Sequence, residues 1–315
     1  MTKPLANMKK PRVHIKFAGL QPRTLRAYRL AIDNFLHFAG KDAVATLKPK
    51  HLDRLLAEFI NTSFQEGDPL TYSGHLLSAL KRFHPELRLQ LPIASQYLRN
   101  WTRAHVPKRA VPASWELVEA MIALALEANE QPLALLLGIG FHAMLRTSEM
   151  MQLTVNHILI HSSKQAFSVV IPTAKTSQGN PQVLQIRDET LWRMAEKVGR
   201  SLQPKALLWK TGPHAFRKRF QQLLTRLGFP TQSYLPYSLR RGGATWYYQT
   251  TLNLDATMTR GQWACQKTCR IYVDTGTLQL AHLSWTPKQA KRVRQWRLKG
   301  ANLRLRQRKT NLAYD

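Results

Sequence analysis

Short apolar runs with helical spacing, ended by glycine or proline, occupy the first third of this chain and constrain its fold more than any other feature. The runs lie at residues 24–40, 52–60, 76–83 and 93–101. In each run the apolar side chains recur every three or four residues, which is typical of an amphipathic helix. Four such helices can bury their apolar faces against one another. We therefore expect an all-α domain over residues 21–105, preceded by a basic arm over residues 1–20.

The composition changes over residues 106–114, Val-Pro-Lys-Arg-Ala-Val-Pro-Ala-Ser. Two prolines and two basic residues between periodic segments are typical of an extended linker. Ser114 then suits the N-cap of the next helix. Since a single core stops growing near roughly 250 to 300 residues, 315 residues favour two domains. We place the second domain at residues 115–286.

One pair of β-rich runs interrupts the helical pattern of this second domain. Residues 167–173 and 183–186 are rich in branched and aromatic side chains, and Gln-Gly-Asn-Pro at residues 178–181 separates them. Such a pair predicts a β-hairpin. Lys175 lies just before its turn. The expected fold class is therefore mainly α with a small hairpin or sheet, that is, α+β.

The charge balance points to a polyanionic partner. Lysine and arginine number 47 against 18 aspartate and glutamate residues, a formal net charge of +29. Nucleic acid is the leading partner, and an anionic membrane surface is second. No apolar stretch reaches the roughly 18 residues of a membrane helix, and Met-Thr-Lys-Pro at residues 1–4 does not begin a signal peptide, so we expect an intracellular protein.

The two cysteines, Cys265 and Cys269, give little material for a disulfide framework, and we interpret them as reduced thiols. No paired histidines follow at zinc-finger spacing, so a metal site is not expected.

Residues 237–245, Tyr-Ser-Leu-Arg-Arg-Gly-Gly-Ala-Thr, have the composition of an anion site. Arg240 and Arg241 precede a Gly-Gly-Ala step, and at a helix N-terminus such small side chains would let a phosphate come close. A second arginine of interest, Arg146, follows a nearly all-apolar run over residues 132–145. From the residues alone, a structural ion pair of Arg146 with Glu149 is the favoured interpretation.

Taken in order, these residues resemble the catalytic pattern of the tyrosine recombinases, the phage integrase family. Residues 145–153, Leu-Arg-Thr-Ser-Glu-Met-Met-Gln-Leu, resemble its first arginine box, and residues 239–245 resemble its second. The family order is arginine, a hairpin lysine, His-x-x-Arg, histidine or tryptophan, and tyrosine. The corresponding residues here are Arg146, Lys175, Tyr237 with Arg240, Trp263 and Tyr272. The resemblance covers about residues 115–285, and the N-terminal third resembles the family only in architecture.

The resemblance implies a helical, SAM-like core-binding domain and a catalytic domain that together form a C-shaped clamp on duplex DNA. It implies strand cleavage through a 3′-phosphotyrosyl intermediate, with no metal, ATP or other cofactor. Arg146 and Arg240 would neutralise the phosphate, and Lys175 would protonate the leaving 5′ oxygen. Trp263 would donate its indole N–H, and Tyr272 would be the nucleophile.

Tyr237 departs from the family pattern, which has histidine at this position. A phenol holds a phosphate by hydrogen bond but is a poor base near neutral pH. Two alternatives to an active recombinase or integrase therefore stay open: a catalytically silent DNA-binding protein with the same fold, and an enzyme like the type IB topoisomerases. Supporting or DNA-contacting roles are expected for Glu149, Arg241, Lys108, Arg109, Arg217 and Lys218.

The resemblance also implies an assembly of four protomers on two DNA sites, with a monomer possible when free. After Tyr272, the leucines at positions 278, 280 and 283 would pack on a neighbouring subunit. Residues 287–315 form a tail with ten lysines and arginines between Lys288 and Lys309. We expect a nucleic-acid arm or a nuclear-import signal, and a membrane-surface helix is the weaker alternative. The expected location is the nucleus of a eukaryote or the cytoplasm and nucleoid of a prokaryote.

Overall fold

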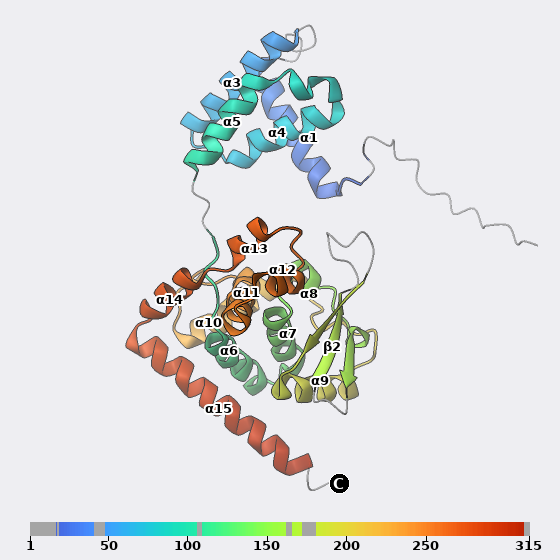
Figure 1. Ribbon diagram of the computed structural model, residues 1–315, viewed down its shortest axis with the longest axis vertical. Helices are drawn as coiled ribbons and strands as arrows, with labels where there is room; N and C mark the ends of the chain where they lie inside the picture. Colours follow the sequence, from blue (N-terminus) through green and yellow to red (C-terminus); the bar gives the residue numbers. More distant parts are fainter. Residues whose placement is uncertain are drawn as a thin grey trace, which may run out of the picture. The chain divides into compact units, whose positions relative to one another are not determined.

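The chain divides into two compact units, residues 1–108 and residues 109–315 (Figure 1). The division lies inside the range expected to be the linker. The computed structural model describes residue 17 and residues 19–40, 48–105, 109–161, 166–171 and 181–311, with residues 302–311 described as backbone alone. Each unit has its own cluster of buried apolar side chains.

The first unit is the expected helical module. Its elements are α1 (Pro22–Ala39), α3 (Pro49–Gln65), α4 (Leu70–Phe83), the short 3₁₀ helix η2 (Pro85–Leu89) and α5 (Pro92–Ala104). Three of the four α-helices begin with proline, whose fixed φ suits the first helical position. The buried carboxylate of Asp53 on α3 accepts hydrogen bonds from the backbone N–H groups of Ile93 and Ala94, at 2.9 and 2.8 Å. Asp53 thus satisfies the open N-terminus of α5 and fixes the α3–α5 pair.

The second unit is built mainly of helices. They are α6 (Trp115–Glu127), α7 (Gln131–His142), α8 (Thr147–Met150), η3 (Val155–His157), α9 (Glu189–Ser201), α10 (Gly212–Leu227), α11 (Tyr237–Thr251), α12 (Leu254–Gly261), α13 (Gln266–Tyr272), α14 (Thr275–Leu283) and α15 (Pro287–Asn311). Ser114 is the N-cap of α6, as expected, because its hydroxyl oxygen accepts from the N–H of Leu117 at 3.2 Å. The helix α7 is buried nearly all round, which its apolar sequence predicted. Among the described helices, none is both long and apolar enough to span a membrane.

A three-stranded antiparallel sheet lies at one side of this unit, in the order β1 (Ile158–His161), β2 (Ala166–Ile171) and β3 (Gln182–Ile186). The pairing of β2 with β3 is the predicted hairpin, with Val169 opposite Leu184. The strand β1 was not predicted, because four residues give too short a pattern to recognise. The sheet packs on α9 (Figure 1).

The helix α11 lies against α7, α12 and α13 (Figure 1). A Cβ atom at Gly242 would lie 1.9 Å from the carbonyl oxygen of Ala113, and one at Gly243 would lie 2.0 Å from that of Phe141. The interpretation of this Gly-Gly step as room for a phosphate is therefore wrong. The two glycines let α11 approach neighbouring backbone closely.

The helix α15 packs along α6 (Figure 1), so residues 287–301 are not a free basic arm. Val293 is buried, and the Nε of Arg297 lies 2.8 Å from a carboxylate oxygen of Glu119. Lys299 forms an ion pair with Glu127. This contact was not predicted, because the acidic partners lie more than 170 residues earlier in the chain.

Candidate active site

Arg240 is the most deeply buried of the described residues predicted for the site, with 1% of its surface exposed. Its Nη1 donates to the carbonyl oxygen of Met144, and its Nη2 donates to that of Gly261 at 2.6 Å. Met144 has a left-handed backbone, with φ of 51°, at the turn that follows α7. The guanidinium therefore joins α11 to the ends of α7 and α12.

Two aromatic rings cover the Arg240 guanidinium. Its Cζ lies 4.8 Å from the ring centroid of Trp263 and 5.2 Å from that of Tyr272. The two rings are 4.5 Å apart with an angle of 34° between their planes. The positive charge of the guanidinium attracts the electron-rich faces of both rings. Arg240 thus holds the predicted tryptophan and tyrosine together.

Gly261 makes this arrangement possible, and the sequence analysis did not identify it. A Cβ atom at this position would lie 2.0 Å from Cζ3 of Trp263, which is far inside van der Waals contact. Its carbonyl oxygen also accepts from Arg240. The sequence alone does not show this role of the glycine, because the contact depends on where the indole ring of Trp263 lies.

Tyr237 and Tyr272 meet at their hydroxyl groups, and the Tyr237 hydroxyl donates the hydrogen bond. Burial raises the pKa of Tyr237, and the bond to Tyr272 raises it further. Burial alone would also raise the pKa of Tyr272, but the hydrogen bond from Tyr237 and the charge of Arg240 outweigh it, so this pKa lies below the ordinary value. Tyr237 therefore stays a donor over the pH range in which Tyr272 ionises.

Arg146 lies between α7 and α8 and forms the expected ion pair with Glu149. Its Nη1 is 2.6 Å from one carboxylate oxygen, and its backbone N–H donates to the other at 2.7 Å. Glu149 is buried, with 4% of its surface exposed. The positive charge of Arg146 lowers the pKa of Arg240, after the larger effect of burial. The two guanidinium groups therefore interact electrostatically.

Lys175, in the segment that joins β2 to β3, lies outside the described residues. Lys108 also lies outside them. Arg109 is exposed. The flanking strand β3 is tied to the site by Arg260 of α12, which donates to the carbonyl oxygens of His142 at 2.8 Å and Gln185 at 3.1 Å.

A cavity of about 400 Å³ lies beside Tyr237. It is lined by Thr147, Pro213, His214, Arg217, Leu235, Pro236 and Tyr237. Arg217 and Lys218 are both exposed on α10. Two other basic residues of α10 form ion pairs, Arg219 with Glu130 and Arg226 with Glu127. The cavity therefore has a cation at its edge.

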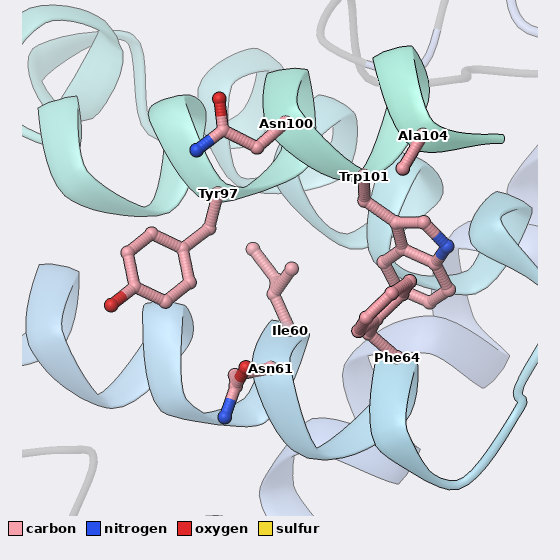
Figure 2. Close-up of a pocket in the computed structure, with 7 residues that line it drawn as sticks. All are labelled: Ile60, Asn61, Phe64, Tyr97, Asn100, Trp101 and Ala104. Atoms are coloured by element: carbon pink, nitrogen blue, oxygen red, sulfur yellow. The ribbon is translucent and has the colours of Figure 1, made fainter.

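A second cavity, of about 260 Å³, lies in the first unit between α3 and α5 (Figure 2). It is lined by Ile60, Asn61, Phe64, Tyr97, Asn100, Trp101 and Ala104. The side chains of Asn61, Tyr97 and Asn100 are exposed, while Trp101 is buried. The site combines aromatic surface with amide and hydroxyl groups. Sequence periodicity predicted both helices but did not single out these residues.

Comparison with known proteins places the fold. The chain is 17% identical to the XerH site-specific recombinase in its pre-cleavage complex with difH substrate, with a TM-score of 0.55 over 83% of this chain and 79% of that one. It is 13% identical to a lambda integrase dimer bound to a COC′ core site, with a TM-score of 0.60 over 83% of this chain and 92% of that one. It is 13% identical to the Tn1549 transposon integrase in complex with transposon right end DNA, with a TM-score of 0.56 over 84% and 94%.

No protein-family model matches the chain, and a search of curated proteins finds no match either. The structural likeness nevertheless extends over both units of the chain, since the coverage exceeds four fifths. The chain has the fold of the tyrosine recombinases: a helical unit followed by a mainly helical unit with a small antiparallel sheet. The α+β fold predicted from the sequence is confirmed.

Proposed function

We propose that this chain cleaves and rejoins duplex DNA through Tyr272, as a site-specific recombinase or integrase. The observation that carries the proposal is the convergence of Tyr272, Arg240, Trp263 and Tyr237 at one place. This set lies in a fold shared with lambda integrase bound to DNA and with the Tn1549 transposon integrase in complex with transposon right end DNA. The net charge of +29 supports a DNA partner.

The reaction begins when the phenol of Tyr272 loses its proton to solvent, and the ionised oxygen then attacks the scissile phosphorus. A bond forms between this oxygen and phosphorus, and the bond from phosphorus to the 5′ oxygen breaks. The products are a 3′-phosphotyrosyl link and a 5′-hydroxyl strand end. Rejoining is the reverse reaction by the same or another 5′-hydroxyl, so the bond energy is conserved and ATP is not required. The lowered pKa of Tyr272 supports its role as nucleophile.

The charge that develops on the phosphate would be balanced by Arg146 and Arg240, which stay protonated and bind oxygens in a fixed geometry. The Nε1 of Trp263 is buried and has no hydrogen-bond partner among the described residues, and its N–H would donate to a nonbridging oxygen once DNA is bound. Lys175 would protonate the 5′ oxygen as it leaves. Tyr237 would hold Tyr272 and the phosphate by hydrogen bonds. Neither a metal nor another cofactor has a role in this mechanism.

The first unit would contact DNA through the α3–α5 face. The amide groups of Asn61 and Asn100 flank the ring of Tyr97 at the cavity between these helices (Figure 2). Asparagine amides pair with the edge of adenine, and exposed Arg99 and Arg103 of α5 suit phosphate oxygens. Lys108, Arg109, Arg217 and Lys218 would add phosphate contacts.

Strand exchange between two duplexes would require four protomers assembled on two DNA sites. The free protein would be a monomer. The helix α14 supports this proposal. Leu278 is buried within its own unit, while Leu280 and Leu283 are 67% and 82% exposed. Two leucine side chains exposed to water on one short helix indicate a surface that a partner protomer would cover.

A catalytically silent DNA-binding protein is the second candidate. The observation that favours it is Tyr237, which stands where the family has a histidine able to exchange a proton near neutral pH. A silent protein would bind DNA as tightly as an active recombinase would, but it would form no covalent adduct.

Covalent trapping distinguishes the two candidates. The protein is incubated with a pool of nicked duplexes, denatured, and examined for a bound DNA strand. We expect an adduct from the wild type and from a Tyr248→Phe control, and none from Tyr272→Phe. Sequencing of the trapped DNA would identify the target, and plasmid relaxation without strand exchange would instead indicate topoisomerase activity. Absence of an adduct on DNA recovered by binding selection would support the silent candidate.

The salt dependence of binding tests the DNA partner itself. If the basic residues meet phosphates, the logarithm of the binding constant falls with the logarithm of salt concentration, with a slope of about −0.9 per contact. A flat response would remove DNA as the partner.

A further inference from the structure

One face of α11 holds the segment that carries Tyr272. Tyr237, Arg241 and Thr245 are four residues apart, so their side chains lie on the same side of the helix. Tyr237 donates to the Tyr272 hydroxyl, and the Thr245 hydroxyl lies 3.3 Å from the Tyr272 carbonyl oxygen. The Thr245 oxygen also accepts from the backbone N–H of Asp274 at 3.1 Å. The side chain of Tyr272 and the backbone that follows it, at Asp274, are thus attached to α11.

Arg241 makes bonds on both sides of the tyrosine. Its Nη2 donates to the carbonyl oxygen of Ile271 at 3.2 Å and to a carboxylate oxygen of Asp274 at 2.7 Å. The other carboxylate oxygen of Asp274 accepts from the N–H of Thr277 at 3.0 Å and so caps α14. A single guanidinium therefore fixes the chain immediately before and after Tyr272.

The same guanidinium also binds the beginning of the second unit. The Nη1 of Arg241 donates to the carbonyl oxygen of Ala110 at 2.9 Å. Ala110 is the second residue of the unit that spans residues 109–315. Arg241 therefore joins Ala110, near the beginning of the second unit, to the segment that carries Tyr272.

Arg241 is placed to position protein groups and not to bind a phosphate. Only 3% of its surface is exposed. Among the described residues, each hydrogen bond of its guanidinium ends on a protein oxygen, at Ala110, Ile271 or Asp274. Its planar fork can hold several oxygens in fixed directions, which one ammonium group cannot do.

We propose that Arg241 is a positioning residue for strand cleavage, which fixes the backbone at Ile271 and Asp274 relative to Ala110 and so sets the place of the Tyr272 hydroxyl. This inference rests on the proposed role of Tyr272 as nucleophile. It extends that role, because a shift of the linker at Ala110 would be transmitted to the nucleophile through one side chain.

The first test is the rate of adduct formation in a single turnover. Since misplacement of a reacting group by about 1 Å can cost about 100-fold in rate, we expect a loss of this size for Arg241→Ala, with DNA affinity unchanged. Arg241→Lys keeps the charge but cannot span three oxygens, so its loss should exceed about tenfold. The control is Arg193→Ala, which breaks a surface ion pair on α9 and should keep the wild-type rate.

The second test separates positioning of the nucleophile from action on the phosphate. In a Tyr272→Phe background, hydrogen peroxide is supplied as a small nucleophile. Its oxygen bonds to the phosphorus, the bond to the 5′ oxygen breaks, and that oxygen takes up a proton. Adding Arg241→Ala should leave this peroxide-dependent cleavage unchanged. An equal loss of peroxide-dependent cleavage would overturn the proposal, because Arg241 would then act on the phosphate or on the whole fold.

The third test needs no DNA. Amide hydrogen exchange of the free protein reports how firmly residues 271–277 are held. We expect Arg241→Ala to speed exchange there more than tenfold, Asp274→Asn to have a smaller effect because asparagine still caps α14, and Arg193→Ala to have none. Unchanged exchange in Arg241→Ala would refute the positioning role. Failure of the wild type to form an adduct would instead refute the proposed function, so the two failures are distinguishable.

Discussion

The hydroxyl of Tyr237 donates a hydrogen bond to the hydroxyl of Tyr272. A donor at this place stabilises the ionised form of Tyr272, and this pKa lies below its ordinary value. In the proposed mechanism, Tyr237 therefore supports Tyr272 even though it stands where the tyrosine recombinases have histidine. It replaces proton exchange near neutral pH by a fixed hydrogen bond.

The first prediction concerns Tyr237→Phe, which removes this donor and leaves the ring. Because the ionised phenol is the attacking form, cleavage should rise with pH toward the pKa of Tyr272. Loss of a hydrogen bond to a charged group, worth about 1.5–3 kcal/mol, should slow cleavage roughly tenfold or more and move the rise to higher pH. The measurement is the rate of adduct formation as a function of pH.

Tyr237→His is the matched variant for this experiment. An imidazole near its usual pKa of about 6.5 would add a second inflection near neutral pH. An identical pH profile for wild type, Phe and His variants would show that Tyr237 does not act on Tyr272.

The second prediction concerns Gly261, beside Trp263. In Gly261→Ala the new Cβ would lie 2.0 Å from the indole ring, which must move away from Arg240 and Tyr272. Overpacking of this kind costs about 1–3 kcal/mol of the free energy of unfolding, and we also expect loss of adduct formation. Gly199→Ala is the control, because nothing lies within 4 Å of a Cβ there and the change should stabilise α9. Wild-type activity in Gly261→Ala would contradict the placement of Trp263 in the site.

The third prediction concerns His142, a buried side chain between the rings of Trp115 and Trp246. Its Nε2 has no hydrogen-bond partner among the described residues. Burial lowers its pKa to about 4, and the charge of Arg260 contributes, while Asp188 opposes the shift. The unfolded chain, with an ordinary pKa of about 6.5, takes up the proton first as the pH falls. Stability is therefore lost between about pH 6.5 and pH 4, by roughly 3 kcal/mol.

His142→Phe tests this prediction, since phenylalanine preserves the aromatic contacts and has no proton to gain. Urea unfolding at about pH 7.5 and about pH 4.5 should show a smaller loss in the variant, by about 3 kcal/mol. Equal losses in the two proteins would show that another group is responsible.

Sequence reasoning succeeded where the signal is local. The helices of the first unit follow from apolar spacing and from the glycines and prolines at their ends, as at Gly40 and Pro92. The resemblance to a known order of residues predicted a common site for Arg240, Trp263 and Tyr272, and the structure brings these three side chains into contact. Lys175 stays a prediction, because it lies outside the described residues.

Sequence reasoning failed where a residue's role depends on a distant partner. Gly242 looked like room for a phosphate until its contact with Ala113, in a segment more than 100 residues earlier, gave it a packing role. The ion pair of Arg241 with Asp274 was not predicted, because it depends on how α11 lies against the chain after α13. Neither contact leaves a periodic pattern in the sequence.

The last prediction concerns the basic helix α15. Removal of residues 287–315 would expose the surface that Val293 covers and leave Glu119 without Arg297 and Glu127 without Lys299. Because burial of one aliphatic side chain contributes about 1.5–3 kcal/mol, we expect this truncation to lower the free energy of unfolding by at least that amount. If residues 287–315 were a free arm, their removal would leave the free energy of unfolding unchanged.

Removal of residues 302–315 alone is the matched control. This shorter truncation keeps Val293, Arg297 and Lys299 and removes four of the ten basic residues counted in the tail. It should leave thermal unfolding unchanged, and if those residues meet phosphate, it should weaken DNA binding and lower the salt slope by about 0.9 for each lost contact. Equal stability of the two truncations would show that the contact of α15 with α6 does not stabilise the unit. Equal DNA binding by the shorter truncation and the full chain would show that the distal basic residues contribute no phosphate contacts.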